Sequence, residues 1–153
     1  MEISGRNKVL VINDPAISAL HLLYESKYAR IEYHDFLQMF VHIWSINTIE
    51  MVREEFMGEM QVLAGFFKQM KVKRVFVDQR GFYFEIDRDM QSWIDYNVNR
   101  ILFEKNVEKI AFVVPPDILA RMSMQSLFGH EYSSKLPTRW FDSFDQAKGW
   151  IEK

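Results

Sequence analysis

Charged residues that could bind a ligand or a partner stand directly after an apolar, strand-like run at residues 73–77. Open α/β sheets commonly bind ligands at the carboxyl ends of their strands. We expect the charged side chains to cluster at that edge, where opposite charges could hold a polar ligand or a partner's charged side chain. The alternative is a loop salt bridge plus a helix cap. The residues concerned are Asp78, Arg80, Asp87 and Arg88.

The same stretch contains Gly81 followed by the aromatic residues Phe82, Tyr83 and Phe84. One core rarely needs so many rings from one loop, so at least one is expected to form an exposed contact patch or a pocket wall. Plain burial and an interface, including a homodimer contact, both remain open. Pro116 belongs to a Pro-Pro pair that would stop a later strand on this face and add a contact there.

The sequence lacks the usual signatures of catalysis and of cofactor binding. It has no cysteine, and its 4 histidines are not paired at metal-ligand spacing. Ser126 and His130 are four positions apart, but no Gly-x-Ser-x-Gly elbow or phosphate-binding glycine loop accompanies them. We therefore expect a protein that is not an enzyme and that holds no metal and no cofactor.

Composition narrows the class of partner and the compartment. The formal net charge is −2, with 19 basic and 21 acidic residues, so the chain has no electrostatic footprint for nucleic acid. The sequence has no run of 18 apolar residues, which a membrane span would need, and its first residues do not resemble a signal peptide. The absence of cysteine favours a reducing, cytoplasmic environment.

The 153 residues predict one domain at 22–153, preceded by an arm or extra strand at 1–21 that carries the apolar run 9–12. Two strand-like runs at 24–33 and 36–44, with a turn at His34-Asp35, predict an antiparallel hairpin. Helices and strands then alternate, so we expect an α/β fold with a mixed four- to five-stranded sheet whose later strands are parallel.

Periodicity locates the helices. Apolar residues three and four apart predict a long amphipathic helix over 47–70, with Asn47 and Glu50 as a capping box. The buried stripe of this helix is expected to contain Ile49, Val52, Phe56, Met60, Leu63, Phe67 and Met70. Such a stripe is more typical of a core than of a cofactor slot. Further helices are expected from about Asp87, over 117–128 with Ile118, Met122 and Leu127 inward, and over 144–151. Strands are expected at 74–77, 109–114 and 138–141.

This order of elements, with the runs at 23–28, 73–78, 109–115 and 139–151, resembles the STAS superfamily over residues 22–153. The likeness is to its small free-standing bacterial branch, related to the CRAL-TRIO lipid-binding fold. Antagonists of this superfamily carry Asp-x-Ser-Gly after a strand and a phosphorylated serine at the next helix start. Here Asp78 and Gly81 match the first motif, but Arg88 and Asp89 stand where the serine would be.

The resemblance implies a regulatory domain that binds a protein partner through Asp78 to Arg88 and Pro116, without the usual phosphorylatable serine. The CRAL-TRIO relation implies an alternative: a small carrier or sensor of an apolar or amphipathic, lipid-like ligand. The two hypotheses differ in the interior, because a carrier needs a cavity lined by Met and Phe, whereas a partner-binding domain needs only a closed core.

Overall fold

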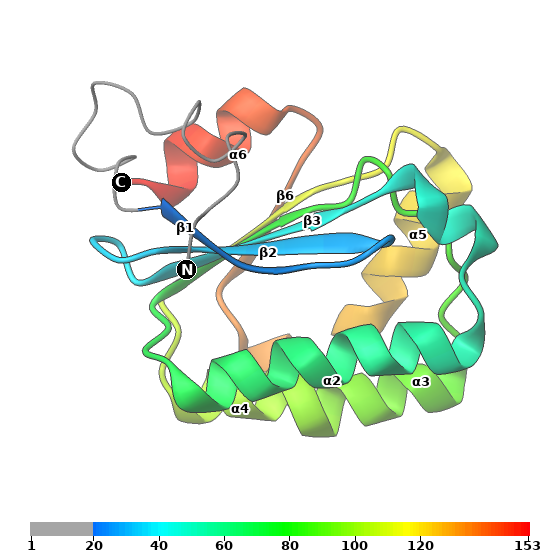
Figure 1. Ribbon diagram of the computed structural model, residues 1–153, viewed down its shortest axis with the longest axis horizontal. Coiled ribbons are helices and arrows are strands. Elements are labelled where there is room, and N and C mark those ends of the chain that lie inside the picture. Colours follow the sequence, from blue (N-terminus) through cyan, green and yellow to red (C-terminus); the bar gives the residue numbers. More distant parts are fainter. Residues whose placement is uncertain (1–19) are drawn as a thin grey trace.

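The computed structural model describes residues 20–153, which form an α/β fold around a mixed six-stranded sheet (Figure 1). The strands lie side by side in chain order. The apolar run at 9–12 lies outside the described residues, while Leu20 and His21 open the first strand. The strands are β1 (Leu20–Glu25), β2 (Ala29–His34), β3 (Met39–Trp44), β4 (Arg74–Asp78), β5 (Lys109–Val113) and β6 (Thr138–Phe141).

The sheet has more strands than expected because a turn divides the predicted run at 24–33. Ser26 Oγ accepts hydrogen bonds from the backbone N–H groups of Tyr28 and Ala29 at 3.0 and 3.1 Å, which reverses the chain between β1 and β2. The second turn lies at 35–38, where Gln38 adopts a positive φ of 51°. β1, β2 and β3 are antiparallel, and β3 to β6 are parallel, as the alternation of elements predicts.

The first long helix, α2 (Arg53–Gln69), begins later than predicted. Ser45 caps a short 3-10 helix, η1 (Ile46–Glu50), and the Val52 backbone N–H donates to Glu55 Oε1 at 3.0 Å to start α2. The predicted capping box at Asn47 and Glu50 is therefore wrong. Ile49 and Val52, assigned to the buried stripe, are exposed, whereas Phe56, Met60, Leu63 and Phe67 are buried as predicted.

The second crossover is a helix interrupted by a π turn. Asp87 caps α3 (Arg88–Ile94), as predicted, by accepting from the Met90 backbone N–H at 2.9 Å. The π segment η2 (Asp95–Asn99) and then α4 (Arg100–Glu104) continue it.

After β5 the chain forms α5 (Ile118–Gln125) and the short 3-10 helices η3 (Ser126–Phe128) and η4 (Ser133–Lys135). Leu127 is buried as predicted, but Ile118 and Met122 are exposed, and Met124 is buried instead. The helical period was identified correctly, but the face that meets the core was not, because apolar residues occur on both sides of α5.

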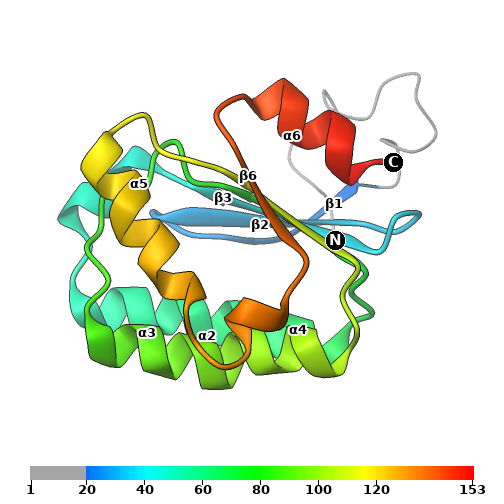
Figure 2. The same ribbon diagram turned by 180° about the vertical axis from the view of Figure 1, so that it is seen from behind.

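The helices form unequal layers on the two faces of the sheet (Figures 1 and 2). The segments α2, α3 and α4 cover one face, and α5 runs from the end of the sheet toward them. α6 (Phe144–Ile151), capped by Ser143, packs on the other face against β4, β5 and β6. The main core thus lies between the sheet and α2 to α5, with a smaller cluster under α6. No helix in residues 20–153 is long and apolar enough to cross a membrane.

Candidate ligand cavity beneath the loop after β4

The charged residues of the predicted face form separate pairs. Asp78 is buried and accepts from the Arg80 backbone N–H at 3.1 Å, from Nε at 3.0 Å and from Nη2 at 2.7 Å. The Arg80 guanidinium lies 4.9 Å from the ring centroid of Phe144 in α6, so this pair is directed toward the α6 face.

Asp87 is directed toward the opposite helical layer. It contacts Arg53 of α2 at 2.5 Å while capping α3. The hydrogen bond from the Met90 backbone N–H, followed by the charge of Arg53, lowers the pKa of Asp87. Arg88 and Pro116 are exposed. The loop salt bridge and the helix cap, which the sequence left open as the alternative, thus both occur, and the four charges do not form one cluster.

Gly81 allows the loop after β4 to lie against the segment after β3. A Cβ atom at this position would stand 2.9 Å from Trp44 O and 3.0 Å from Ile46 N, closer than side chains approach a backbone. Thr48 fixes the contact, because its hydroxyl donates to Gly81 O at 3.0 Å and accepts from the Tyr83 backbone N–H at 2.9 Å. The two segments therefore form one unit at the carboxyl end of the parallel strands.

The loop has an outer and an inner side. Tyr83 is 44% exposed, which fulfils the expectation of at least one surface aromatic ring, whereas Phe82 is buried with its ring centroid 4.8 Å from that of Trp44. Gln79, Phe82 and Ile86 face inward and line a cavity. The residues expected to contact a partner therefore alternate with residues that form the wall of an internal site.

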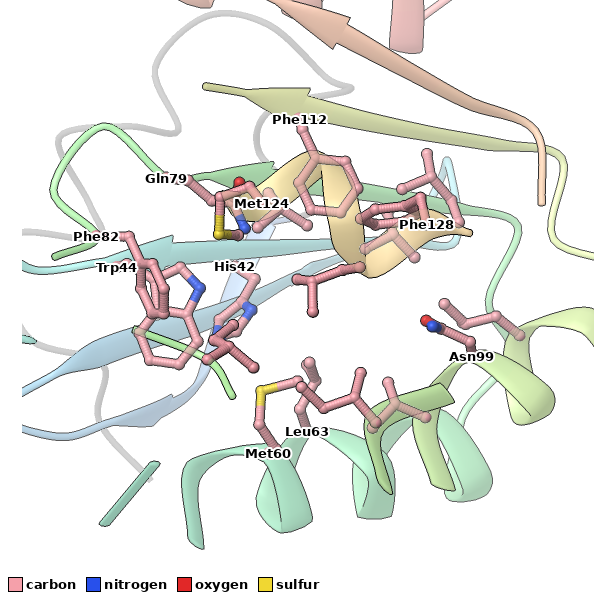
Figure 3. A pocket seen from close by; sticks show the side chains of 18 of the residues that line it. His42, Trp44, Met60, Leu63, Gln79, Phe82, Asn99, Phe112, Met124 and Phe128 are labelled. Atoms are coloured by element: carbon pink, nitrogen blue, oxygen red, sulfur yellow. The ribbon is translucent and has the colours of Figure 1, made fainter. Parts of the chain in front are cut away.

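The cavity lies between the sheet and the helices and has a volume of about 80 Å³ (Figure 3). That space would hold roughly two or three water molecules, which is more than the voids common in a packed core. Most of its wall is apolar, and its polar side chains come from β3, the loop after β4 and the π segment. Residues labelled in the figure are His42, Trp44, Met60, Leu63, Gln79, Phe82, Asn99, Phe112, Met124 and Phe128.

Two polar atoms in the cavity wall have no hydrogen-bond partner among residues 20–153. They are Nε2 of His42 and Oε1 of Gln79. The residue His42 is 2% exposed and the residue Gln79 is 4% exposed. Burial lowers the pKa of His42 to about 3, so the imidazole is neutral at pH 7. A buried polar group without a partner costs about 1–3 kcal/mol, which marks these two atoms as unusual in a core.

Asn99 enters the cavity wall through the π segment. The buried Asp95 carboxylate accepts from Asn99 Nδ2 at 3.2 Å and from the backbone N–H groups of Tyr132 and Ser133 at 3.0 and 2.9 Å. A π turn inserts an extra residue into a helix and is frequent at functional sites. Here it faces the cavity with an amide that Asp95 holds in place.

A second hollow of about 530 Å³ lies on the other face, between α6 and the antiparallel strands. Apolar residues such as Met39, Val41 and Phe144 line it, together with an ion pair of 2.7 Å between Arg30 Nη2 and Glu32 Oε2. Leu20, where the described part of the chain begins, also lines it. Nothing among the described residues shows what covers this groove.

The described residues contain no group of three or more His, Cys, Asp or Glu side chains that could hold a metal ion. Ser126 and His130 are bridged by Gln91, whose Nε2 is 3.5 Å from Ser126 Oγ and whose Oε1 is 3.3 Å from His130 Nε2. An amide cannot act as a general base, so this chain of contacts does not form a nucleophile-activating pair.

The sequence analysis did not single out Gln79, His42 or Asn99 as cavity residues. Period-2 alternation in β3 places His42 on the buried face between Phe40 and Trp44, and that signal was available. No sequence pattern indicated the π segment that positions Asn99.

Comparisons with family models, with curated proteins and with solved structures give no significant match for this chain. The resemblance to the STAS superfamily therefore stays a hypothesis, and the function must be argued from the geometry alone.

Proposed function

We propose that this chain is a non-catalytic binding domain that holds a small, largely apolar molecule in the cavity between the sheet and helices α2 to α5. The observation that carries the proposal is the cavity itself, whose mostly apolar wall includes His42 and Gln79, two residues that each have a buried polar atom without a hydrogen-bond partner among residues 20–153. A bound molecule that hydrogen-bonds to them would remove their desolvation penalty, and the rest of its surface would contact apolar side chains.

The cavity volume restricts the ligand's size. Pockets for drug-sized molecules measure roughly 300–1,000 Å³. A volume of about 80 Å³ suits a compact molecule rather than a lipid-like one with an extended acyl chain. We therefore propose a carrier or sensor of a compact ligand, which is a smaller class of ligand than the lipid-like molecules that the sequence suggested.

The two-sided loop after β4 supports a sensor in particular. Phe82 and Ile86 line the cavity, while the intervening Tyr83 is exposed and tied to Thr48. A ligand that packs against Phe82 and Ile86 could change the position of Tyr83, because the three residues belong to one short loop.

Native mass spectrometry of protein purified without denaturation tests the proposal. We expect wild-type protein to retain a small additional mass, and Leu63→Phe, which adds volume at the cavity wall, to lose it. Ile118→Phe, a similar enlargement at an exposed position, is the matched control and should retain the mass. An apo mass for the wild type would contradict the proposal, as would an additional mass that all three proteins share.

A second candidate function is the binding of a protein partner, as in STAS-like regulation without a phosphorylated serine. The observation that favours it is the exposure of apolar side chains on segments that follow the parallel strands, where Figure 1 shows them at one end of the sheet. The partner could be another protein or a second copy of this chain. The exposed side chains are Ile46, Ile49, Val52, Tyr83, Ile118, Leu119 and Met122.

The second candidate is tested by comparing Ile49→Ser with Phe36→Ser in partner capture and in sedimentation. Phe36 is also exposed, but it lies in the turn between β2 and β3, at the opposite end of the sheet. Loss of capture or of self-association in Ile49→Ser alone would support an interface at the carboxyl end. Equal behaviour of the two variants would exclude it.

A further inference from the structure

We infer that the groove beside α6 is the docking site for residues 9–12 of this chain, the apolar run Val-Leu-Val-Ile. This run lies outside the described residues. The inference concerns the face of the sheet opposite the ligand cavity and does not depend on the proposed function. It follows from the chemistry of the groove and from the sequence that leads into it.

The groove has an apolar floor and one helical wall. Alternation along β3 places Met39, Val41 and Ile43 in the groove, and Val41 lies opposite Phe76 of β4 in the parallel register. α6 packs on β4, β5 and β6 and contributes wall residues such as Phe144. Val41 and Ile43 stay partly exposed in this hollow of about 530 Å³. β3 therefore offers an apolar surface beside α6.

The charged side chains that line the groove are paired with each other. Arg30 Nη2 lies 2.7 Å from Glu32 Oε2, and Lys148 Nζ lies 2.9 Å from Glu152 Oε2. An ionic ligand would have to compete with these partners, and it would place charge against apolar side chains. A short, uncharged, apolar stretch of peptide requires no such exchange and suits the groove better.

Residues 9–12 match this chemistry. They are four consecutive aliphatic residues, flanked by Lys8 and Asn13. A continuous apolar run, unlike an alternating one, is typical of a segment whose side chains are buried on two sides. The groove provides two such sides, because the sheet forms one and α6 forms the other.

The connection to β1 keeps this run within reach of the groove. Leu20, the first described residue, itself lines the groove, and Figures 1 and 2 both show the start of β1 close to the end of α6. Residues 13–19 join the run to Leu20 and span roughly 25 Å when extended. The floor from Met39 to Ile43 measures only about 13 Å. A short tether also gives the run a high local concentration at the groove, which a separate peptide lacks.

Cysteine cross-linking tests the inference, since the chain has no cysteine of its own. Asn13→Cys would be combined with Lys148→Cys at the groove, or with Gln61→Cys at an exposed position of α2, which covers the other face. A short bismaleimide would join the two thiols, and digestion followed by mass spectrometry would measure the intramolecular product. We expect the Lys148 pair to cross-link at least about tenfold faster than the Gln61 pair. Equally slow cross-linking of both pairs would overturn the inference.

A charge placed in the run shows whether the run itself is what docks. Leu10→Asp, added to the Asn13 and Lys148 cysteine pair, should reduce the cross-linking rate about tenfold, because a carboxylate in an apolar groove loses its hydration. Ile3→Asp makes the same change outside the run and is the matched control, which should leave the rate unchanged. Equal rates in the two variants would overturn the inference, as would a product that mainly joins two molecules. Leu10→Asn repeats the test if Leu10→Asp does not fold.

Backbone ¹H–¹⁵N chemical shifts locate the contact independently. Relative to the wild type, Leu10→Asp should shift the amide signals of Val41, Ile43 and Ile151, which line the groove. The signal of Ile49, an exposed residue at the carboxyl end of the sheet, should not change. Shifts at Ile49 without shifts at Val41 and Ile43 would place the run on the other apolar surface and overturn docking beside α6.

Discussion

The role that we propose for Gln79 in ligand binding predicts that this residue reduces the stability of the fold. Its buried Oε1 lacks a partner in the described structure, so replacing the amide with an apolar group of similar size removes a desolvation cost. We expect Gln79→Leu to raise the free energy of unfolding by about 1 kcal/mol, measured by urea denaturation, while abolishing ligand retention.

Gln91→Leu is the matched control for this prediction. The Gln91 amide donates to Ile86 O at 3.2 Å and contacts His130 at 3.3 Å, so its loss should reduce stability. If Gln79→Leu were as destabilising as Gln91→Leu, Gln79 would be a satisfied structural residue, and the argument for its role in binding would not hold.

Because His42 is buried as a neutral imidazole, the free energy of unfolding should fall as the pH falls. Its pKa is about 3 in the folded protein, below the value of about 6.5 in an unfolded chain, so the unfolded state takes up the proton first as the pH falls. The wild type should therefore lose about 2 kcal/mol more than His42→Phe between pH 7 and pH 5. Denaturation at a series of pH values measures this, and parallel pH profiles for the two proteins would show that His42 is not buried as a neutral imidazole.

At the scale of elements, the contact between the loop after β4 and the segment after β3 depends on Gly81. Gly81→Ala would place a Cβ atom 2.9 Å from Trp44 O and 3.0 Å from Ile46 N, so one of the two segments must move. We expect a loss of about 2 kcal/mol in the free energy of unfolding. Gly149→Ala in α6, where a Cβ would meet nothing within 4 Å, should instead stabilise the helix by about 0.5–1 kcal/mol. Equal effects of the two substitutions would contradict the close packing at Gly81.

Most elements could be predicted from the sequence because their hydrophobic periods were long, as in α2, or were bounded by turn residues and prolines, as in β5. The predicted ends of elements were wrong where a short polar side chain forms hydrogen bonds with the nearby backbone. Ser26 Oγ turns the chain inside an apolar run, and Ser45 starts η1 ahead of α2. The prediction of the inward face of α5 was wrong for another reason. Apolar residues lie on both sides of this short helix, so tertiary packing decides which side meets the core.

For the molecule as a whole, the sequence predicted where the loop after β4 lies but not the cavity beneath it. The motif around Asp78 and Arg80 indicated the carboxyl end of the strands, where the loop after β4 indeed forms one wall of the cavity. The cavity itself depends on side chains from β3, β4 and β5, from α2 to α5 and η3, from the loop after β4 and from the π segment. Its volume is what remains after all of them pack, and no local pattern carries that information.

The layered architecture predicts how a bound ligand should affect the rest of the molecule. The cavity lies between the sheet and α2 to α5, whereas α6 packs on the opposite face against a separate cluster (Figure 2). Ligand binding stabilises the native state by mass action and most strongly protects the segments that contact the ligand.

Hydrogen exchange should therefore be slower in the ligand-retaining protein than in the same protein stripped of its ligand for peptides covering residues 79–86, η2 and α5, with little change for α6. The loop after β4 should respond most, because its inner residues Phe82 and Ile86 contact the cavity while its outer residue Tyr83 is exposed. Leu63→Phe serves as the control, because it should lose both the ligand and this protection. Equal protection of α6 and the loop would mean that the ligand stabilises the fold globally or binds in the groove beside α6, and it would contradict a ligand site between the sheet and α2 to α5.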